Sequence, residues 1–267
     1  MSYNGHTRFR PGADADFAAF KTAATDYVVN LAPEERLGLL EKPLDWGLGH
    51  VGYFMAMYQL FNGLQALRLT PGDKLLEVGG GAGWATEIMA SLAYRVTVIE
   101  PSAAMIDVAR QRVQAHVRNY GKPEMINNVS WQCAVLEEAL LFDGFADAAI
   151  FFESFHHLID EHEALRRTFA ALRPGGQIAI LGDSNWNPGN RQQEEAWIAE
   201  MAAFGTLESP FTDAYLVWLL DHHGFVDIQR NHMVNGLIPI EREAEPIANF
   251  IQLHASGNNL VLARKPG

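Results

Sequence analysis

The sequence predicts an α/β protein with a largely parallel sheet and helices on both of its faces. A short apolar run, Leu75 to Val78, leads directly into a glycine-rich turn and a helical segment, as a buried parallel strand does before its helix. From residue 70 onward, strand-like runs alternate with helix-like segments, which indicates a doubly wound sheet. The run from Asp147 to Phe152 is apolar after its first residue, so it is expected to be central.

Helical spacing predicts a helical region before this sheet. Residues 1–12 read as a loose arm, and residues 14–30 carry apolar side chains close to helical spacing. A second short helix is expected to open at residues 33–36, where a proline precedes acids near the positive end of the helix dipole. A third, rich in aromatics, is expected over residues 46–67, with a stripe predicted to be plain core that comprises Phe54, Tyr58 and Phe61.

The remaining elements follow from apolar runs and from the turns between them. Strands are expected over residues 75–78, 95–100, 129–133, 147–152, 177–181, 225–230 and 259–264. Helices are expected over residues 84–90, 101–118, 161–172, 192–204 and 212–222. Loops or turns are expected over residues 70–73, 120–128, 173–176 and 182–190.

Composition excludes several classes of protein. The formal net charge is −12, which argues against a nucleic-acid partner, because phosphate binding needs concentrated lysine and arginine. No stretch of eighteen apolar residues occurs, so no membrane span is expected. The single cysteine, Cys133, permits no internal disulfide and fits a reducing cytoplasm. The polar N-terminus lacks the apolar segment of a signal peptide.

The turn after Val78 indicates a nucleotide-type cofactor. Glycines let the backbone approach a ligand, since no Cβ intervenes and positive φ carries little penalty. A dinucleotide fingerprint fails here, because Trp84 or Thr86 stands where its third glycine belongs. A phosphate loop fails as well, because no lysine follows the glycines before Lys122. The pattern present is E-x-G-x-G-x-G, beginning at Glu77.

This pattern resembles the first motif of the class I S-adenosylmethionine-dependent methyltransferases, whose cofactor has no phosphate to neutralise. The turn from Leu172 to Gly176 and the His223 to Phe225 entry to a late strand are similar to that family too. The resemblance covers roughly residues 70–267. It implies a Rossmann-like, mostly parallel seven-stranded sheet, with one antiparallel strand near an edge. Residues 1–69 would then be a helical cap or lid, and residues 70–267 the cofactor-binding domain.

The resemblance also implies the cofactor contacts. Gly79, Gly81 and Gly83 would line the methionine end of S-adenosylmethionine, and Glu77 would orient its amino group. Glu100 would hold the ribose. Met105 either covers the adenine or is ordinary core, and adenine is read either by Glu137 or by the backbone near Leu136. The predicted cofactor-binding residues are Glu77, Gly79, Gly80, Gly81, Gly83, Glu100, Pro101, Met105, Leu136 and Glu153.

The acceptor side is expected at the ends of the fourth and fifth strands and in the N-terminal cap. His156 or His157 is the candidate general base for a hydroxyl acceptor, although one of them could simply pack or cap the next helix. A magnesium site built on Glu153 and Asp183 is an alternative that the strand-end pattern fits poorly, so no metal is predicted. The predicted acceptor-binding residues are Trp46, His50, Tyr53, Asp183, Asn185 and Trp186.

The function predicted from these residues is methyl transfer from S-adenosylmethionine to a small molecule. Oxygen is favoured as the acceptor atom, with carbon or nitrogen as alternatives, and in-line displacement requires the acceptor to be aligned with the methyl group. Two other functions stay open. One is a cofactor-binding or scaffold protein that has lost catalysis, and the other is a nicotinamide-dependent oxidoreductase.

Overall fold

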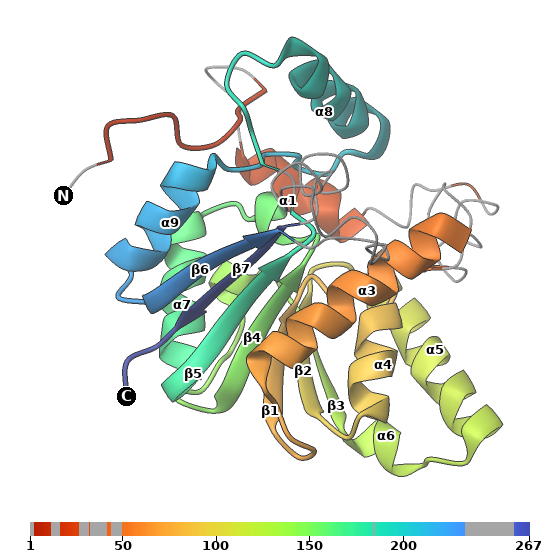
Figure 1. Cartoon of the computed structure of the whole chain (residues 1–267). Helices are drawn as coiled ribbons and strands as arrows, with labels where there is room; N and C mark the ends of the chain where they lie inside the picture. Colours follow the sequence, from red (N-terminus) through yellow and green to blue (C-terminus); the bar gives the residue numbers. More distant parts are fainter. Residues whose placement is uncertain are drawn as a thin grey trace, which may run out of the picture.

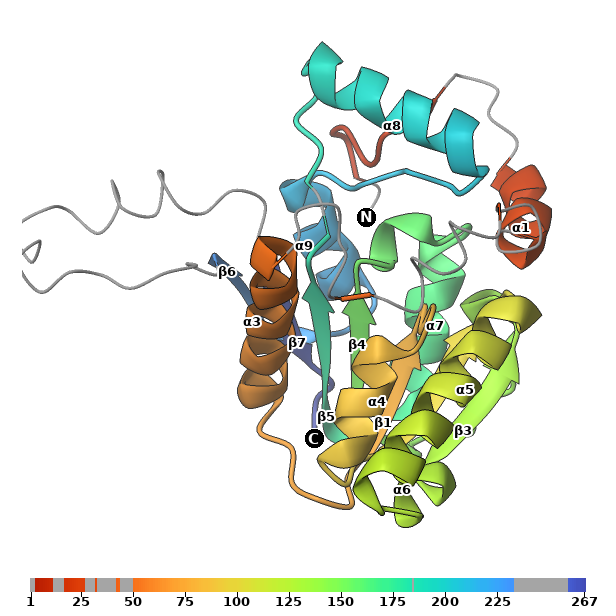
Figure 2. The ribbon, with the colours of Figure 1, turned by 90° about the vertical axis from the view of Figure 1, so that its right-hand side faces the viewer.

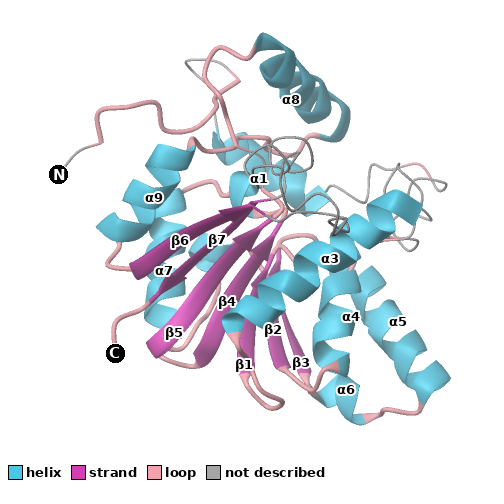
Figure 3. Cartoon of the chain, in the orientation of Figure 1, coloured by secondary structure: helices cyan, strands magenta, loops and turns pink. Residues whose placement is uncertain are grey.

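The computed structural model describes residues 3–11, 17–26, 32, 42–43, 50–183, 185–232 and 259–267. A seven-stranded sheet with the order β3-β2-β1-β4-β5-β7-β6 forms its centre (Figures 1 and 3). β7 runs antiparallel to both of its neighbours, and the other neighbouring strands in the sheet pair in parallel, as the family resemblance implies. The strands are β1 (Lys74–Val78), β2 (Arg95–Glu100), β3 (Val129–Cys133), β4 (Ala146–Phe152), β5 (Leu172–Leu181), β6 (Val226–His232) and β7 (Asn259–Arg264).

Four of the eight described α-helices begin at a residue whose side chain caps them. The side chains of Ser102, Asp160, Asn190 and Thr212 accept hydrogen bonds from the first turns of α5, α7, α8 and α9, and such caps satisfy otherwise unpaired N–H groups. The expected loop at residues 120–128 is partly wrong, because it contains the short helix α6. The α-helices are α1 (Phe17–Asp26), α3 (His50–Leu67), α4 (Trp84–Ser91), α5 (Ala103–Tyr120), α6 (Glu124–Asn127), α7 (Glu161–Ala171), α8 (Arg191–Phe204) and α9 (Asp213–His222).

Helices cover both faces of the sheet (Figures 1 and 2), and an apolar cluster is buried on each face. Successive strand residues point to opposite faces. Leu75 therefore packs with α3 and α4, and Leu76 packs with α7 and α9. Two short 3₁₀ turns, η1 (Leu136–Glu138) and η2 (Phe155–His157), follow β3 and β4. The doubly wound arrangement is confirmed. None of the helices described is long and apolar enough to cross a lipid bilayer.

The stripe that α3 buries is not the one the sequence predicted. Phe54, Tyr58 and Phe61 are 65%, 39% and 47% exposed, so their assignment to the core is wrong. A second stripe on the same helix, made of Ala56, Leu60, Leu64 and Leu67, faces the sheet instead. Helical periodicity identified the helix but could not choose between two apolar faces. The helix expected at residues 33–36 and the first residues of the third lie outside the described residues.

The turn expected at residues 173–176 is part of β5. Ala146 pairs with Leu172, and the next pair in the register is Ala148 with Gln177. Residues 173–176 of β5 are therefore extra relative to β4, which has only Asp147 between its two paired residues. Gly175 adopts a φ of 77°, which favours glycine. The predicted stop is therefore a bulge that stays within the sheet.

Residues 3–11, which we call the N-terminal strap, are not a loose arm. Phe9 donates its backbone N–H to the carbonyl of Pro210 at 2.9 Å, and Arg8 pairs with Phe211 in an antiparallel bridge. The Arg8 side chain is buried. Figure 2 shows the strap beneath α8, where Phe9 and Trp197 have ring centroids 5.3 Å apart.

Candidate functional site

The glycine turn after β1 has a backbone that only glycine adopts readily. Gly79, Gly81 and Gly83 have φ values of 75°, 50° and 76°. Hydrogen bonds hold the turn, because the N–H of Gly79 donates to the carbonyl of Ile99 at 2.8 Å and that of Gly83 to Gly80 at 2.9 Å. The turn is therefore a rigid connection between β1 and α4.

Three of these glycines have a packing reason to be glycine, and one does not. A Cβ at Gly79 would lie 2.5 Å from the Cβ of Ser154, one at Gly80 2.3 Å from Val98 Cγ1, and one at Gly83 2.5 Å from the Cβ of Ala109. A Cβ at Gly81 would meet nothing within 4 Å. The open space beside Gly81 is a cradle into which a ligand could fit against bare backbone.

Glu77 lies buried beneath this turn. Its Oε2 accepts a hydrogen bond from the hydroxyl of Thr86 at 2.5 Å. The pKa of Glu77 is raised to about 8. Burial is the main cause, the hydrogen bond from Thr86 opposes the rise, and the nearby charge of Glu100 adds to it. A carboxyl this strongly perturbed beside an open cradle is typical of a functional group.

Glu100, at the end of β2, ties the turn to the next helix. Its Oε2 accepts from the N–H of Gly81 and its Oε1 from the N–H of Ser102, both at 2.9 Å. Each carboxylate oxygen has two lone pairs, so capacity remains for the two hydroxyls of a ribose. Burial raises the pKa of Glu100, and these two N–H groups oppose the rise. Pro101, also predicted to contact the cofactor, follows directly and is half-buried.

The predicted adenine region lies between α5 and η1. Met105 is buried and packs on Ala82 of the glycine turn. The Glu137 carboxylate accepts from the N–H groups of Ile159 and Asp160 at 2.9 and 3.0 Å, so it is committed to the start of α7. Leu136 is buried. Of the two readings that the sequence left open, the geometry favours backbone groups near Leu136.

Glu153 follows β4 in a strained conformation, with a φ of 49°. A Cβ on the facing Gly182 would come within 2.8 Å of Glu153 Cγ, so a bare glycine makes room for the carboxyl group. Burial raises the pKa of Glu153 to about 7, against the effect of Lys42 and His156. Strain and a perturbed pKa at a strand end are both marks of a functional site.

His156 lies between two carboxylates. Its Nδ1 contacts Asp183, and its Nε2 is 3.2 Å from Glu208 Oε2. Burial lowers the pKa of His156, but Asp183 and Glu208 outweigh it and raise the pKa to about 10. The ring is therefore a cation at neutral pH, with both nitrogens engaged.

His157 is held differently from its neighbour. Its Nδ1 is 2.6 Å from the carbonyl of Leu207 and 3.6 Å from Glu208 Oε1. Burial and the adjacent His156 lower the pKa of His157 to about 4, so the ring is neutral. Sequence reasoning missed Glu208, because no motif or periodicity marks the segment that carries it.

The predicted acceptor residues do not form one group. Asp183 joins the histidines, whereas the carbonyl of Asn185 accepts from the Gln193 side chain at 3.0 Å. Trp186 is half-buried against Phe9 and donates its indole N–H to Glu194 at 2.9 Å. Tyr53 is half-buried. Trp46 and the side chain of His50 lie outside the described residues.

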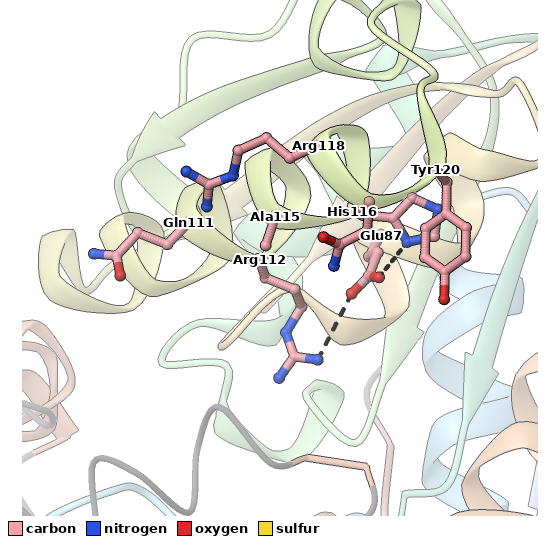
Figure 4. A pocket seen from close by; sticks show the side chains of 8 residues that line it. Glu87, Gln111, Arg112, Ala115, His116, Arg118 and Tyr120 are labelled. Carbon is pink, nitrogen blue, oxygen red and sulfur yellow. Dashed lines mark hydrogen bonds and ion pairs between the residues drawn. The ribbon is translucent and has the colours of Figure 1, made fainter.

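A separate polar cleft of about 450 Å³ lies along α5 and α4 (Figure 4). Glu87 is paired there with Arg112 and His116. Arg112 Nε also donates to the carbonyl of Ala82 at 3.1 Å, so the cleft adjoins the back of the glycine turn. None of the predicted site residues lines it.

Part of the chain matches a known protein family. The family described as "Methyltransferase domain" matches residues 76–180, which run from β1 into β5 and include the turn, Glu100 and the histidine pair. Over these residues the comparisons support a class I S-adenosylmethionine-dependent methyltransferase domain. The expectation drawn from the E-x-G-x-G-x-G pattern is confirmed.

Curated relatives of this methyltransferase differ in the reactions that they are named for. A ubiquinone/menaquinone biosynthesis C-methyltransferase UbiE from Rubrivivax gelatinosus is 30% identical over 41% of this chain and 39% of that protein. An S-adenosyl-L-methionine-dependent Diels-Alderase from Talaromyces variabilis is 25% identical over 66% of this chain and 61% of that protein. The chain thus matches less than two thirds of the length of either relative.

Solved structures share the fold across nearly the whole methyltransferase. A geranyl diphosphate C-methyltransferase from Streptomyces coelicolor, in complex with Mg²⁺, geranyl-S-thiolodiphosphate and S-adenosyl-L-homocysteine, has a TM-score of 0.65 at 17% identity. The match covers 96% of this chain and 100% of that one. A phosphoethanolamine N-methyltransferase from Haemonchus contortus has a TM-score of 0.58 at 18% identity, over 86% and 59% of the chains. Identities this low show the fold alone.

Proposed function

We propose that this chain transfers a methyl group from S-adenosylmethionine to a small-molecule acceptor. The observation that carries the proposal is the open space beside Gly81, in a turn whose N–H bonds the buried Glu100 and beneath which Glu77 is buried. A dinucleotide would bring a pyrophosphate to this turn, and the turn lacks the glycine spacing for it. The cofactor named for the curated and structural relatives supports the same choice.

The residues around the cradle fit the parts of that cofactor. The remaining lone pairs of Glu100 face the place of the ribose hydroxyls, and Glu77 is available for the amino group. Met105 and the backbone near Leu136 flank the place of the adenine. When bound, S-adenosylmethionine supplies an electrophilic methyl group on a sulfonium. The protein's task is then to align an acceptor with that methyl group and to exclude water.

The ends of β4 and β5 supply the acceptor side. His156 and His157 were the predicted candidates for the general base, and their surroundings favour His157. Its ring is neutral and only its Nδ1 is hydrogen-bonded among the described residues, whereas both nitrogens of His156 face carboxylates. Glu153 is a further candidate, since a pKa of about 7 lets it take a proton near neutral pH. Oxygen stays the favoured acceptor atom. The C-methyltransferases among the relatives make carbon the main alternative.

Cofactor binding is tested by isothermal titration of the whole chain. We expect S-adenosylhomocysteine to bind and NADH not to bind. Glu100→Ala should weaken S-adenosylhomocysteine binding at least about tenfold, because two charge-assisted hydrogen bonds are lost. Glu138→Ala is the matched control, since Glu138 is exposed. Binding of NADH alone would overturn the proposal.

Methyl transfer itself is tested by following S-adenosylhomocysteine formation with a panel of phenols, enols, carboxylates and amines. Turnover with any acceptor establishes the reaction. Cofactor binding with no turnover across an exhaustive panel and a crude metabolite extract would favour the cofactor-binding role instead. Lower turnover in Glu153→Gln or in His157→Gln, at unchanged cofactor affinity, would identify the proton acceptor.

A further inference from the structure

We infer that His156, His157 and Glu208 form a binding site for one divalent transition-metal ion. One ligand atom from each residue can be chosen so that all three lie within 4.8 Å of one another. The Nε2 of His156 is 3.2 Å from one Glu208 oxygen, a separation that matches neighbouring ligands of one ion, whose metal–ligand bonds are about 2.0–2.2 Å. The ring of His157 lies with its centroid 4.0 Å from that of His156. Its Nδ1 bonds the Leu207 carbonyl, so its Nε2 is the nitrogen left for a metal.

Asp183 orients His156 as the outer partner of a metal ligand does. Its carboxylate contacts the Nδ1 of His156 and leaves Nε2 directed at Glu208. Metal-binding histidines commonly donate their second ring nitrogen to a carboxylate, which fixes the ring and its tautomer. Asp183 is itself held, because it accepts the backbone N–H of His156 at 2.9 Å.

The surrounding backbone keeps the ligands in place. Arg8 donates to the carbonyl of His156, in the middle of η2, at 3.2 Å and to that of Leu158, just after η2, at 2.9 Å. The hydroxyl of Thr206 donates to Glu208 Oε1 at 3.1 Å. The cluster is therefore a preformed constellation on η2 and on the segment before α9.

The charge around the cluster favours a divalent cation. Among the described residues, Glu153, Glu200 and Glu208 interact electrostatically with the cluster, and Asp183 adds a fourth acid. Among the described residues, the positive charges that act on Glu153 are those of Lys42 and His156. Carboxylates removed from water in excess of their cations are costly unless a cation compensates them, and Asp183 and Glu208 are buried, whereas Glu200 is exposed. A divalent ion on Nε2 of His156 would displace the proton there and so replace one positive charge by two.

The ligand set selects the class of ion. Two imidazoles and one carboxylate suit Zn²⁺, Co²⁺, Fe²⁺ or Mn²⁺, whereas Mg²⁺ and Ca²⁺ prefer oxygen ligands throughout. Three protein ligands leave positions open. If the proposed methyl transfer holds, these positions would take an oxygen of the acceptor, and the histidines would then act as ligands and not as the base.

Cobalt binding tests the inference independently of turnover. The full chain, freed of metal by a chelator, is titrated with Co²⁺ and followed by visible absorption and calorimetry. We expect one ion per chain. Glu208→Gln and His157→Gln should each weaken binding at least about tenfold, and Asp183→Asn about 10–100-fold through the orientation of His156. Circular dichroism checks that each variant is folded, and the half-exposed His157 is the safest position to change.

A second histidine pair on the chain provides the control. His162 lies on α7 and His223 directly after α9, and His162 Nδ1 is 3.0 Å from His223 Nε2. None of the hydrogen bonds and ion pairs described for this pair involves Asp183 or Glu208. His162→Gln should leave cobalt binding unchanged. The inference is overturned if no Co²⁺ binds, if Mg²⁺ competes equally, or if binding survives Glu208→Gln and is lost in His162→Gln. Titration of the metal-free chain with S-adenosylhomocysteine reports separately on the proposed function.

Discussion

Gly81 and Gly83 have similar backbones, with φ of 50° and 76°, but different surroundings. The first faces open space, and the second faces the Cβ of Ala109 at what would be 2.5 Å. The requirement for glycine thus has two sources at neighbouring positions. One is the room that a ligand needs, and the other is the close approach of α5 to the start of α4.

Alanine substitutions separate these two requirements. Gly83→Ala should lower the free energy of unfolding by about 2–4 kcal/mol, from strain and overpacking together. Gly81→Ala should cost only about 1 kcal/mol in stability but weaken S-adenosylhomocysteine binding at least about tenfold. Gly72 has a φ of 97° with nothing within 4 Å, so Gly72→Ala is the control for strain alone. Equal cofactor affinity in the Gly81 and Gly72 variants would contradict the cradle. Urea unfolding and calorimetry supply the measurements.

Glu77 should make the ligand-free protein less stable as pH rises. Its folded pKa of about 8 lies above its ordinary value of 4.5, so between these values the folded state holds a proton that the unfolded state has lost. Stability therefore falls from about pH 4.5 to about pH 8 and then levels off. Glu77→Gln should remove roughly 1–4 kcal/mol of this fall while weakening cofactor binding. Urea unfolding at pH 5, 6.5 and 8 checks it, and parallel pH profiles for the two proteins would refute it.

At the scale of elements, the N-terminal strap joins the candidate site through Arg8. Besides the carbonyls of His156 and Leu158, Arg8 donates to Glu161 Oε2 at 2.9 Å and to Ser209 Oγ at 2.7 Å. The strap, η2 and the start of α7 are therefore coupled by one buried guanidinium. Periodicity gave no sign of this, because a single arginine in a polar arm has no pattern.

Removing the guanidinium should destabilise the fold in a pH-dependent way. Arg8→Met leaves Glu161 buried without its partner and should cost about 3–5 kcal/mol at pH 7. Burial raises the pKa of Glu161, but Arg8 and the other hydrogen-bond donors outweigh it and lower the pKa overall. The stability from this pair is thus present above the ordinary pKa of a glutamate and is lost as pH falls through the folded pKa. The deficit of the variant should shrink at low pH.

Urea unfolding at pH 7 and at pH 3 measures this deficit. The matched control is Arg10→Met, since Arg10 lies on the same strap and is exposed. It should change stability by less than about 0.5 kcal/mol. A deficit for Arg8→Met that is the same at both pH values would show that packing, and not the ion pair, carries the effect.

At the scale of the whole molecule, the two proposed sites lie along one edge of the sheet. The cofactor cradle lies at the carboxyl ends of β1 and β2, and the histidine cluster at those of β4 and β5, as expected where parallel strands end together. The net charge of −12 is partly concentrated there, in Glu153, Asp183 and Glu208. An acidic edge of this kind suits a cationic cofactor and a metal ion, and it disfavours phosphate-rich partners.

The sequence by itself determined the parts whose signals are local. The strand, the glycine turn and the acid of the first motif are contiguous, and Glu100 follows at the end of the next strand. Local spacing therefore predicted a cofactor-binding turn, and the resemblance of this motif to a known family predicted the family. The strands and most helices were predicted because apolar periodicity reflects burial within one element. These predictions needed no knowledge of distant contacts.

The tertiary structure alone decided the contacts that depend on how the chain wraps. Glu208 reaches His156, and Arg8 reaches Glu161, across long stretches of sequence that carry no shared pattern. Which apolar face of α3 turns inward was also undecided, since both faces looked suitable until the sheet selected Leu60 over Phe61. Local pattern says that a residue can be buried or can bind, and packing between distant segments decides which neighbours it receives.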